Sequence, residues 1–127
     1  MQRVFKTRNF FRWMRKISLT DKALCTAVSE MEAGLFDADL GGNILKKRIA
    51  LPGRGKSGSS RTLIATNRKN RWFFVYGFEK SDRSNINKKE LEALQDIAID
   101  LLKLNSSQLD NHVSSGALQE ICHDKQD

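Results

Sequence analysis

Apolar residues in the first third of the chain recur with helical spacing, after one short strand-like run. Residues 2–7 suit a short strand. Asn9 can cap a helix that runs to about Ile17. Thr20 and Asp21 start a second helix, which Gly34 ends. The apolar positions of the second helix are Ala23, Leu24, Ala27, Val28 and Met31. The pattern therefore predicts a strand followed by a helical hairpin.

The middle of the chain predicts three strands separated by turn residues. The strands are Ile44–Leu51, Arg61–Thr66 and Trp72–Phe78. A loop at Asp37–Gly42 precedes them, Pro52–Ser60 joins the first two, and Asn67–Asn70 forms a tight turn before the third. Short β-rich runs separated by Gly, Ser and Asn are typical of antiparallel hairpins.

The last third of the chain predicts one long helix and a tail. Asn87 and Glu90 form a capping pair for a helix from Lys88 to Leu104. The tail predicts a short helix, a short strand at residues 116–121 and a loose end.

This order of elements predicts an α+β fold. We expect an antiparallel sheet of about four strands, with the helical hairpin and the long helix packed on one face. Residues 1–104 would form the domain and residues 105–127 a C-terminal extension. The second face of the sheet would then be open to a partner.

Charge is segregated along the chain. Lys and Arg number 22 against 15 Asp and Glu, which gives a net charge of +7. Residues 40–78 contain no acid, and their cations are Lys46, Lys47, Arg48, Arg54, Lys56, Arg61, Arg68, Lys69 and Arg71. A sheet with one positive face suits a polyanion such as RNA or DNA.

Separate elements would bring cations to the same end of the sheet. They are Lys46, Lys47 and Arg48 on the first of the three strands, Arg61 on the second, and Lys80 and Arg83 after the third. Alternation puts Lys46 and Arg48 on one face and Lys47 on the other. The alternative is a solvated edge strand that its lysines protect against aggregation.

The loop and the aromatic residues of this region could each bind nucleic acid or have a purely structural role. Residues 50–57 resemble a phosphate-binding loop but lead into a strand rather than a helix, so nucleotide hydrolysis is not expected. Glycines there would let Arg54 and Lys56 approach a phosphate backbone, unless the segment is a plain surface loop. Alternation assigns to the open face Trp72, Phe74, Tyr76 and Phe78. Such rings can stack on bases, and core packing is the alternative.

Metal and histidine chemistry are not expected in the basic segment. It has no acid that could hold Mg²⁺, and the only histidines, His112 and His123, lie in the tail. No cofactor is expected either. A lysine crowded by cations has a lowered pKa, so a neutral amine can accept the proton of an RNA 2′-OH. The activated oxygen would attack the adjacent phosphate while arginines hold the developing charge.

The two cysteines and the hydropathy of the chain indicate the cellular compartment that we expect for the protein. Cys25 and Cys122 lack metal-ligand spacing, and no signal peptide or long apolar run is present. We therefore expect a cytoplasmic protein with reduced thiols and no membrane partner.

Several blocks of the chain resemble the RelE/HigB-type toxins of bacterial type II toxin–antitoxin systems, in a phage-derived-like branch. The blocks are residues 41–50, 53–58, 60–63 and 73–80, followed by Arg83, Ser84, Asn85 and Ile86. The resemblance covers about residues 2–104, and residues 116–121 are similar too. It implies a RelE/ParE fold and metal-independent cleavage of mRNA on the ribosome. It also implies a cognate antitoxin, commonly with a helix-turn-helix domain, through which alone the complex would contact DNA.

The resemblance assigns roles to particular residues. Lys46 or Lys47 would be the general base, beside Arg48, and Arg61 the main phosphate-binding cation. Lys80 or Arg83 would be a second phosphate ligand or proton donor. Arg48, Arg54 and Lys56 match basic positions that would contact RNA, and the aromatic pattern adds Trp72 and Phe78 as RNA-binding candidates.

One family feature is missing. RelE has a tyrosine near the start of the last helix, where this chain has Ile86 and Asn87, so Phe78 or Trp72 would have to supply base stacking. A ParE-like inhibitor of DNA gyrase and a non-catalytic nucleic-acid-binding module remain the alternatives.

Overall fold

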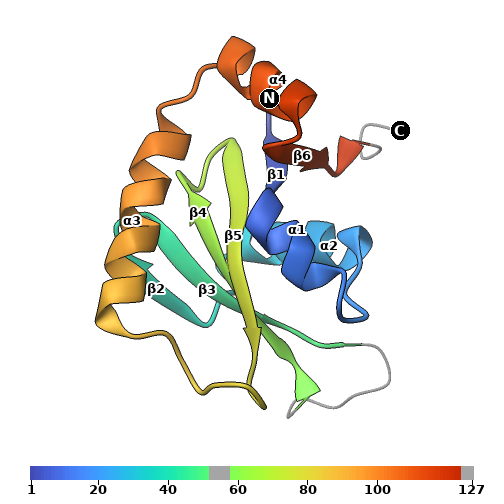
Figure 1. Cartoon of the computed structure of the whole chain (residues 1–127), viewed down its shortest axis with the longest axis vertical. Coiled ribbons are helices and arrows are strands. Elements are labelled where there is room, and N and C mark those ends of the chain that lie inside the picture. The colour runs from blue at the N-terminus through green and yellow to red at the C-terminus, as the bar shows by residue number, and fades with distance from the viewer. Residues whose placement is uncertain (52–57, 124–127) are drawn as a thin grey trace.

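The computed structural model describes residues 1–51 and 58–123, which form a mixed sheet with helices on both sides (Figure 1). The elements are β1 (Arg3–Thr7), α1 (Arg8–Met14), α2 (Asp21–Glu32), β2 (Ala38–Gly41), β3 (Ile44–Ile49), β4 (Ser60–Thr66), β5 (Arg71–Glu79), α3 (Lys88–Leu102), α4 (Ser106–Ser115) and β6 (Leu118–Ile121). The predicted α+β class is confirmed.

The sheet has six strands in the order β2-β3-β4-β5-β1-β6. β1 and β5 are parallel, and the other neighbours are antiparallel. The prediction of a loop at Asp37–Gly42 is wrong, since Ala38–Gly41 pairs with β3 as a hairpin. Gly42 and Asn43 form its turn with φ of 58° and 69°, and positive φ at both positions is the type I′ geometry that twists correctly into a hairpin.

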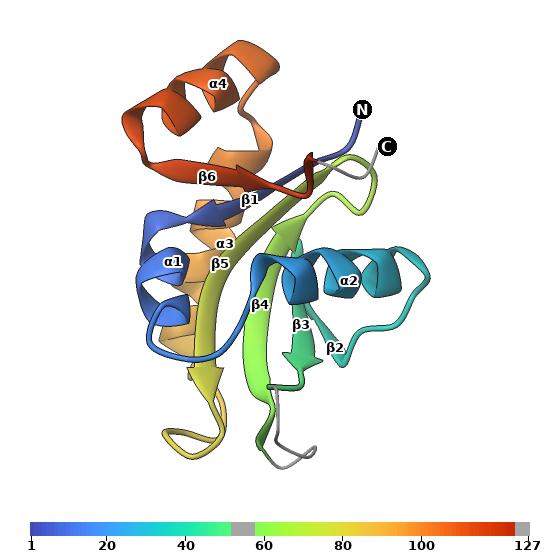
Figure 2. The same ribbon diagram turned by 90° about the vertical axis from the view of Figure 1, so that its right-hand side faces the viewer.

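Helices cover both faces of the sheet, so the expectation that they pack on one face is wrong. Figure 2 shows α1 and α2 on one side and α3 on the other. One core cluster, with Phe10, Leu24 and Trp72, lies beneath α1 and α2, and a second, with Leu63 and Leu94, lies beneath α3. The reason is β5, whose consecutive apolar residues are typical of a strand buried on both faces.

The helix ends follow local capping. Asn87 accepts the backbone N–H of Glu90, and the Glu90 carboxylate accepts that of Asn87, so the predicted capping pair of α3 is confirmed. α1 begins two residues earlier than expected because Thr7, not Asn9, caps it by accepting the N–H of Phe10. α2 begins at Asp21, where its start was predicted, and Thr20 caps it by accepting the N–H of Ala23.

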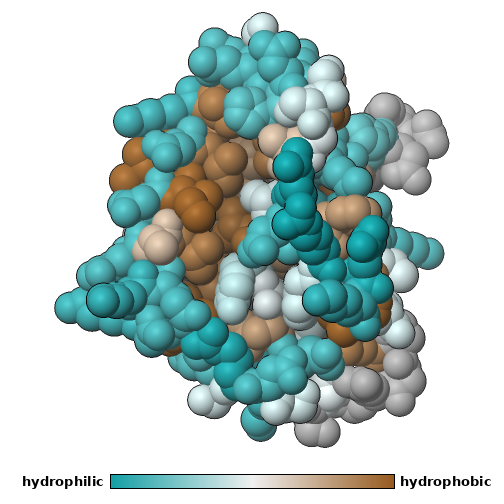
Figure 3. Space-filling view, viewed as in Figure 1, coloured by the Kyte–Doolittle hydropathy of each residue, from teal (hydrophilic) through white to brown (hydrophobic). Residues whose placement is uncertain are grey.

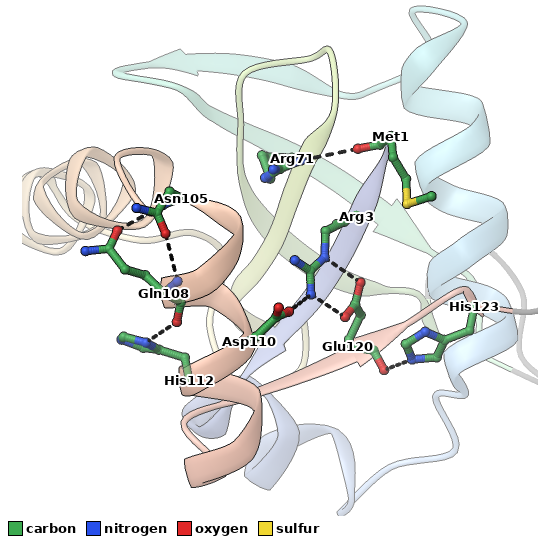
Figure 4. A network of polar contacts seen from close by, with 9 residues as sticks. All are labelled: Met1, Arg3, Arg71, Asn105, Gln108, Asp110, His112, Glu120 and His123. Carbon is green, nitrogen blue, oxygen red and sulfur yellow. Dashed lines mark hydrogen bonds and ion pairs between the residues drawn. The ribbon is translucent and has the colours of Figure 1, made fainter.

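The C-terminal segment joins the sheet edge. β6 pairs with β1, and Arg3 of β1 donates to Glu120 of β6 at 2.7 and 2.8 Å and to Asp110 of α4 at 2.8 Å (Figure 4). These hydrogen bonds raise the pKa of Arg3 and lower that of Glu120.

The expectation of reduced thiols is contradicted by a disulfide between Cys25 and Cys122, which are 97 residues apart in sequence. The pairing of β6 with β1 carries Cys122 to α2, a proximity that sequence spacing cannot show. The tail beyond residue 123, expected to be loose, lies outside the described residues.

Candidate nucleic-acid interface

Strand register places part of the predicted site on the same side of the sheet as α3. Leu63 belongs to the core beneath α3, and Arg61 shares its face because alternate residues of a strand point the same way. Lys46 pairs with Leu63, and Arg48 pairs with Arg61. On β5, Tyr76 pairs with Leu63 and Phe78 with Arg61. We call this set, Lys46, Arg48, Arg61, Tyr76 and Phe78, the basic face.

A β-bulge brings Tyr76 onto the basic face. The register of β4 with β5 shifts between Leu63 and Ile64, which leaves Val75 as the extra residue. Val75 and Tyr76 therefore both pack on the side of α3, although strict alternation separates them. Strict alternation therefore wrongly groups Tyr76 with Trp72, and no residue in the strand signals the bulge.

Arg61 is the arginine of the basic face whose charge is not balanced by a carboxylate of the described residues. It is half-buried, and its Nη1 donates to the carbonyl oxygen and the hydroxyl of Ser59 at 3.0 and 3.3 Å. These neutral acceptors hold the guanidinium without cancelling its charge. Within residues 1–51 and 58–123, no carboxylate forms an ion pair with Arg61 or Lys46. Both cations are thus available to a phosphate.

Arg48 shares the basic face but already has an acidic partner. Its Nε lies 3.3 Å from a carboxylate oxygen of Asp37, and its backbone N–H donates to the other oxygen at 2.6 Å. The side chain is 46% exposed, so solvent weakens this pair. Arg48 can therefore exchange Asp37 for a stronger anion.

Lys47 lies on the opposite face of β3, as alternation predicts. Its Nζ is 2.9 Å from the Glu30 carboxylate and donates to the carbonyl of Leu35 at 2.9 Å. Only 12% of the side chain is exposed. Lys47 therefore links β3 to α2 on the side of the sheet away from the basic face, whereas Lys46 lies on the basic face.

Arg83 is held at the edge of the basic face by a bidentate ion pair. Its Nη1 and Nη2 lie 2.7 and 2.5 Å from the two oxygens of Glu90. Nη1 also donates to the Tyr76 hydroxyl at 3.3 Å, and the guanidinium lies 5.8 Å from the centre of the Phe78 ring. The Arg83 hydrogen bonds lower the pKa of the Glu90 carboxylate, which in turn raises the pKa of Arg83.

Glu90 is the residue that sequence analysis missed here. It was assigned only to the helix cap, yet the same carboxylate accepts the N–H of Asn87 and both Arg83 donors. The seven-residue spacing from Arg83 to Glu90 spans a loop and a helix start, so no periodic pattern reveals the pair.

The two aromatic residues proposed for base stacking are buried. Trp72 is fully buried beneath α1 and α2, on the side away from the basic face. Phe78 is on the basic face but only 3% exposed, with its ring centre 6.1 Å from that of Tyr76. Tyr76 is half-buried and is therefore the more accessible of the two aromatic residues of the basic face.

The remaining predicted cations lie outside this set. Lys80 is exposed in the turn directly after β5. Arg54 and Lys56 fall outside the described residues. Among the described residues, no group of His, Cys, Asp and Glu side chains is arranged to hold a metal ion. None of the described helices is both long and apolar enough to cross a bilayer.

Comparison with known proteins identifies the family. Residues 2–121 match the family model described as the RelE toxin of the RelE/RelB toxin–antitoxin system. A search of curated proteins finds no match. The matched range extends to the end of β6, which pairs with β1 and is the edge strand of the sheet.

Proposed function

Because the chain belongs to the RelE toxin family of toxin–antitoxin systems, we propose that it is a metal-independent endonuclease that cleaves mRNA on the ribosome and so stops translation. It would act in the cytoplasm, and a cognate antitoxin, commonly a helix-turn-helix protein, would neutralise it. The observation that carries the proposal is Arg61, a half-buried guanidinium on the basic face that donates to the neutral carbonyl and hydroxyl oxygens of Ser59.

The proposed reaction is an internal attack within the RNA strand. Lys46, as the general base, would take the proton of the 2′-OH, and the resulting oxygen would attack the adjacent phosphorus. Arg61 would stabilise the extra negative charge on the phosphate oxygens, with Arg48 beside it. The bond to the 5′ oxygen breaks, and Lys80, exposed after β5, would return a proton to that oxygen. DNA lacks the 2′-OH and would resist this route.

Arg83 would have a positioning role. Its two terminal nitrogens are occupied by Glu90, so it offers less charge to a phosphate than Arg61 does. Through Tyr76 and Phe78 it holds the aromatic side of the basic face in place. In this proposal Tyr76 supplies the base-stacking surface for which sequence analysis had named Phe78 and Trp72.

The test is primer extension on a reporter mRNA in a reconstituted translation reaction, with and without ribosomes. The chain should produce discrete cuts only with ribosomes, and Arg61→Ala should abolish them. Lys69→Ala is the matched control, because Lys69 is an exposed cation in the β4–β5 turn away from the basic face. Cuts without ribosomes would reassign the activity to a free ribonuclease. Intact mRNA with continuing translation would refute the nuclease proposal. Inhibition of DNA gyrase would then be the hypothesis to test.

A further inference from the structure

The disulfide between Cys25 and Cys122 ties the C-terminal segment of the chain to α2. Cys25 lies within α2, and Cys122 follows β6 directly. β6 is the edge strand of the sheet and lies between β1 and α4 (Figure 2). Residues 103–121 are therefore anchored at both ends, to α3 by the main chain and to α2 by the sulfur bridge. A segment held at both ends gains less conformational entropy on opening than one held at a single end, so the bridge keeps it closed.

The anchored segment covers apolar side chains of both cores. Leu109 of α4 and Leu118 of β6 are 0% and 3% exposed and belong to the core beneath α3. Figure 3 shows further apolar side chains between α3 and α4, at the margin of this core. Ile121, at the end of β6, belongs to the core beneath α1 and α2. Detachment of β6 and α4 would thus open both cores and leave β1 with an unpaired edge.

The sulfur atoms of this bridge are within reach of a small molecule. A cavity of about 730 Å³ lies between α2 and the end of β6, and both cysteines line it, together with polar residues that include Lys22 and His123. Neither cysteine is fully buried. A disulfide that a small thiol can reach in the folded protein exchanges more readily than one sealed in a core, and accessible disulfides are typically the labile or regulatory ones.

The backbone at Cys122 favours release once the bridge is cut. This residue has a φ of 68°, in the left-handed region that residues with a β-carbon rarely adopt. The bridge to α2 and the pairing of β6 with β1 hold it there. Without the bridge, residue 122 can return to an extended conformation, which would turn the end of β6 away from α2.

We propose that Cys25 and Cys122 form a reversible exchange site for a small thiol such as glutathione, and that reduction frees β6 and α4 to open from the edge of β1. The thiolate of the small thiol attacks one sulfur, the bond between the two cysteines breaks, and the departing sulfur takes up a proton. A second small thiol then displaces the first. Two small thiols are thereby oxidised to one disulfide, while both cysteines are reduced, and oxidation reverses these steps.

The first experiment follows the reduction of the full chain by glutathione in buffer without denaturant. Samples are quenched with acid, free thiols are alkylated, and mass spectrometry gives the reduced fraction. The rate should rise in proportion to the glutathione concentration, and a glutathione adduct on one cysteine should appear as the intermediate. A rate that levels off at the unfolding rate would show that only the unfolded chain is reduced, and it would overturn the proposal.

Hydrogen exchange tests the structural consequence. Reduction should raise the amide exchange rates of β6 and α4 by about tenfold more than those of β4, which lies in the interior of the sheet, because only the C-terminal segment loses an anchor. Equal acceleration in β4 would mean that the bridge stabilises the whole fold and controls no segment, which would refute the proposal.

The control variant carries Cys25→Ser and Cys122→Ser. It should show the exchange pattern of the reduced protein whether or not glutathione is present. A response of this variant to glutathione would place the effect of the thiol elsewhere in the molecule and would also refute the proposal. Neither measurement uses RNA, so failure of the nuclease proposal is seen separately, in the primer-extension experiment.

Discussion

Gly77 is the position where one added methyl group should most clearly disturb the packing of α1 on the sheet. A Cβ at this residue would lie 2.2, 2.5 and 2.6 Å from Cζ3, Cε3 and Cη2 of the Trp13 ring. Carbon atoms in contact normally stand about 3.5–4.0 Å apart, so the ring or the strand must move by roughly 1 Å or more. The φ of Gly77 is outside the left-handed region, so the expected effect of alanine is steric and not conformational.

We expect Gly77→Ala to lower the free energy of unfolding by about 2 kcal/mol, within the roughly 1–3 kcal/mol that overpacking costs in a dense core. For a domain of this size that corresponds to a fall in Tm of about 6–10 °C. Urea denaturation followed by circular dichroism measures the change, and an unaltered m value would show that the unfolded state is unaffected.

The Trp13→Ala background tests the cause. Removing the indole destabilises the protein by itself, but it leaves room for the new methyl group. Gly77→Ala should then cost almost nothing, which gives a coupling energy of about 2 kcal/mol in the double-mutant cycle. The steric reasoning is refuted if Gly77→Ala is as stable as the parent, or if its cost is the same with and without the indole.

Three further outcomes are expected. Cys122→Ser should lower the free energy of unfolding under oxidising conditions by about 2–4 kcal/mol, because the disulfide closes a long loop. In urea denaturation with a reducing agent, the variant and the parent should be equally stable. A stability difference that persists in the reducing agent would contradict this. Glu90→Gln keeps the helix cap but not the charge on the Arg83 partner. Since the pKa of Glu90 is lowered from 4.5, the parent should be more stable than the variant above pH 4.5, and this advantage should vanish as the pH falls through the lowered pKa. A difference in the free energy of unfolding that stays constant with pH would exclude this linkage. Lys46→Ala should abolish mRNA cleavage in the primer-extension assay, and a cleaving Lys46→Ala variant would remove Lys46 as the base.

The sequence determined the elements whose signals are local. Turn residues bound β4 and β5, and Asn87 with Glu90 marks the start of α3, because capping and turn formation depend on groups within about four residues. Of the nine cations in the acid-free residues 40–78, the structure places Lys46, Arg48 and Arg61 on the basic face. Alternation along β3 correctly separated Lys47 from Lys46 and Arg48.

Tertiary structure alone decided which side chains meet. The bulge at Val75 turns Tyr76 toward Arg83, the second helical layer buries Trp72, and the pairing of β6 with β1 joins Cys122 to Cys25. Each of these depends on segments far apart in the chain. The period of a strand predicts two faces but not what covers each, because burial on both faces and a one-residue register shift are set by the packing of distant partners.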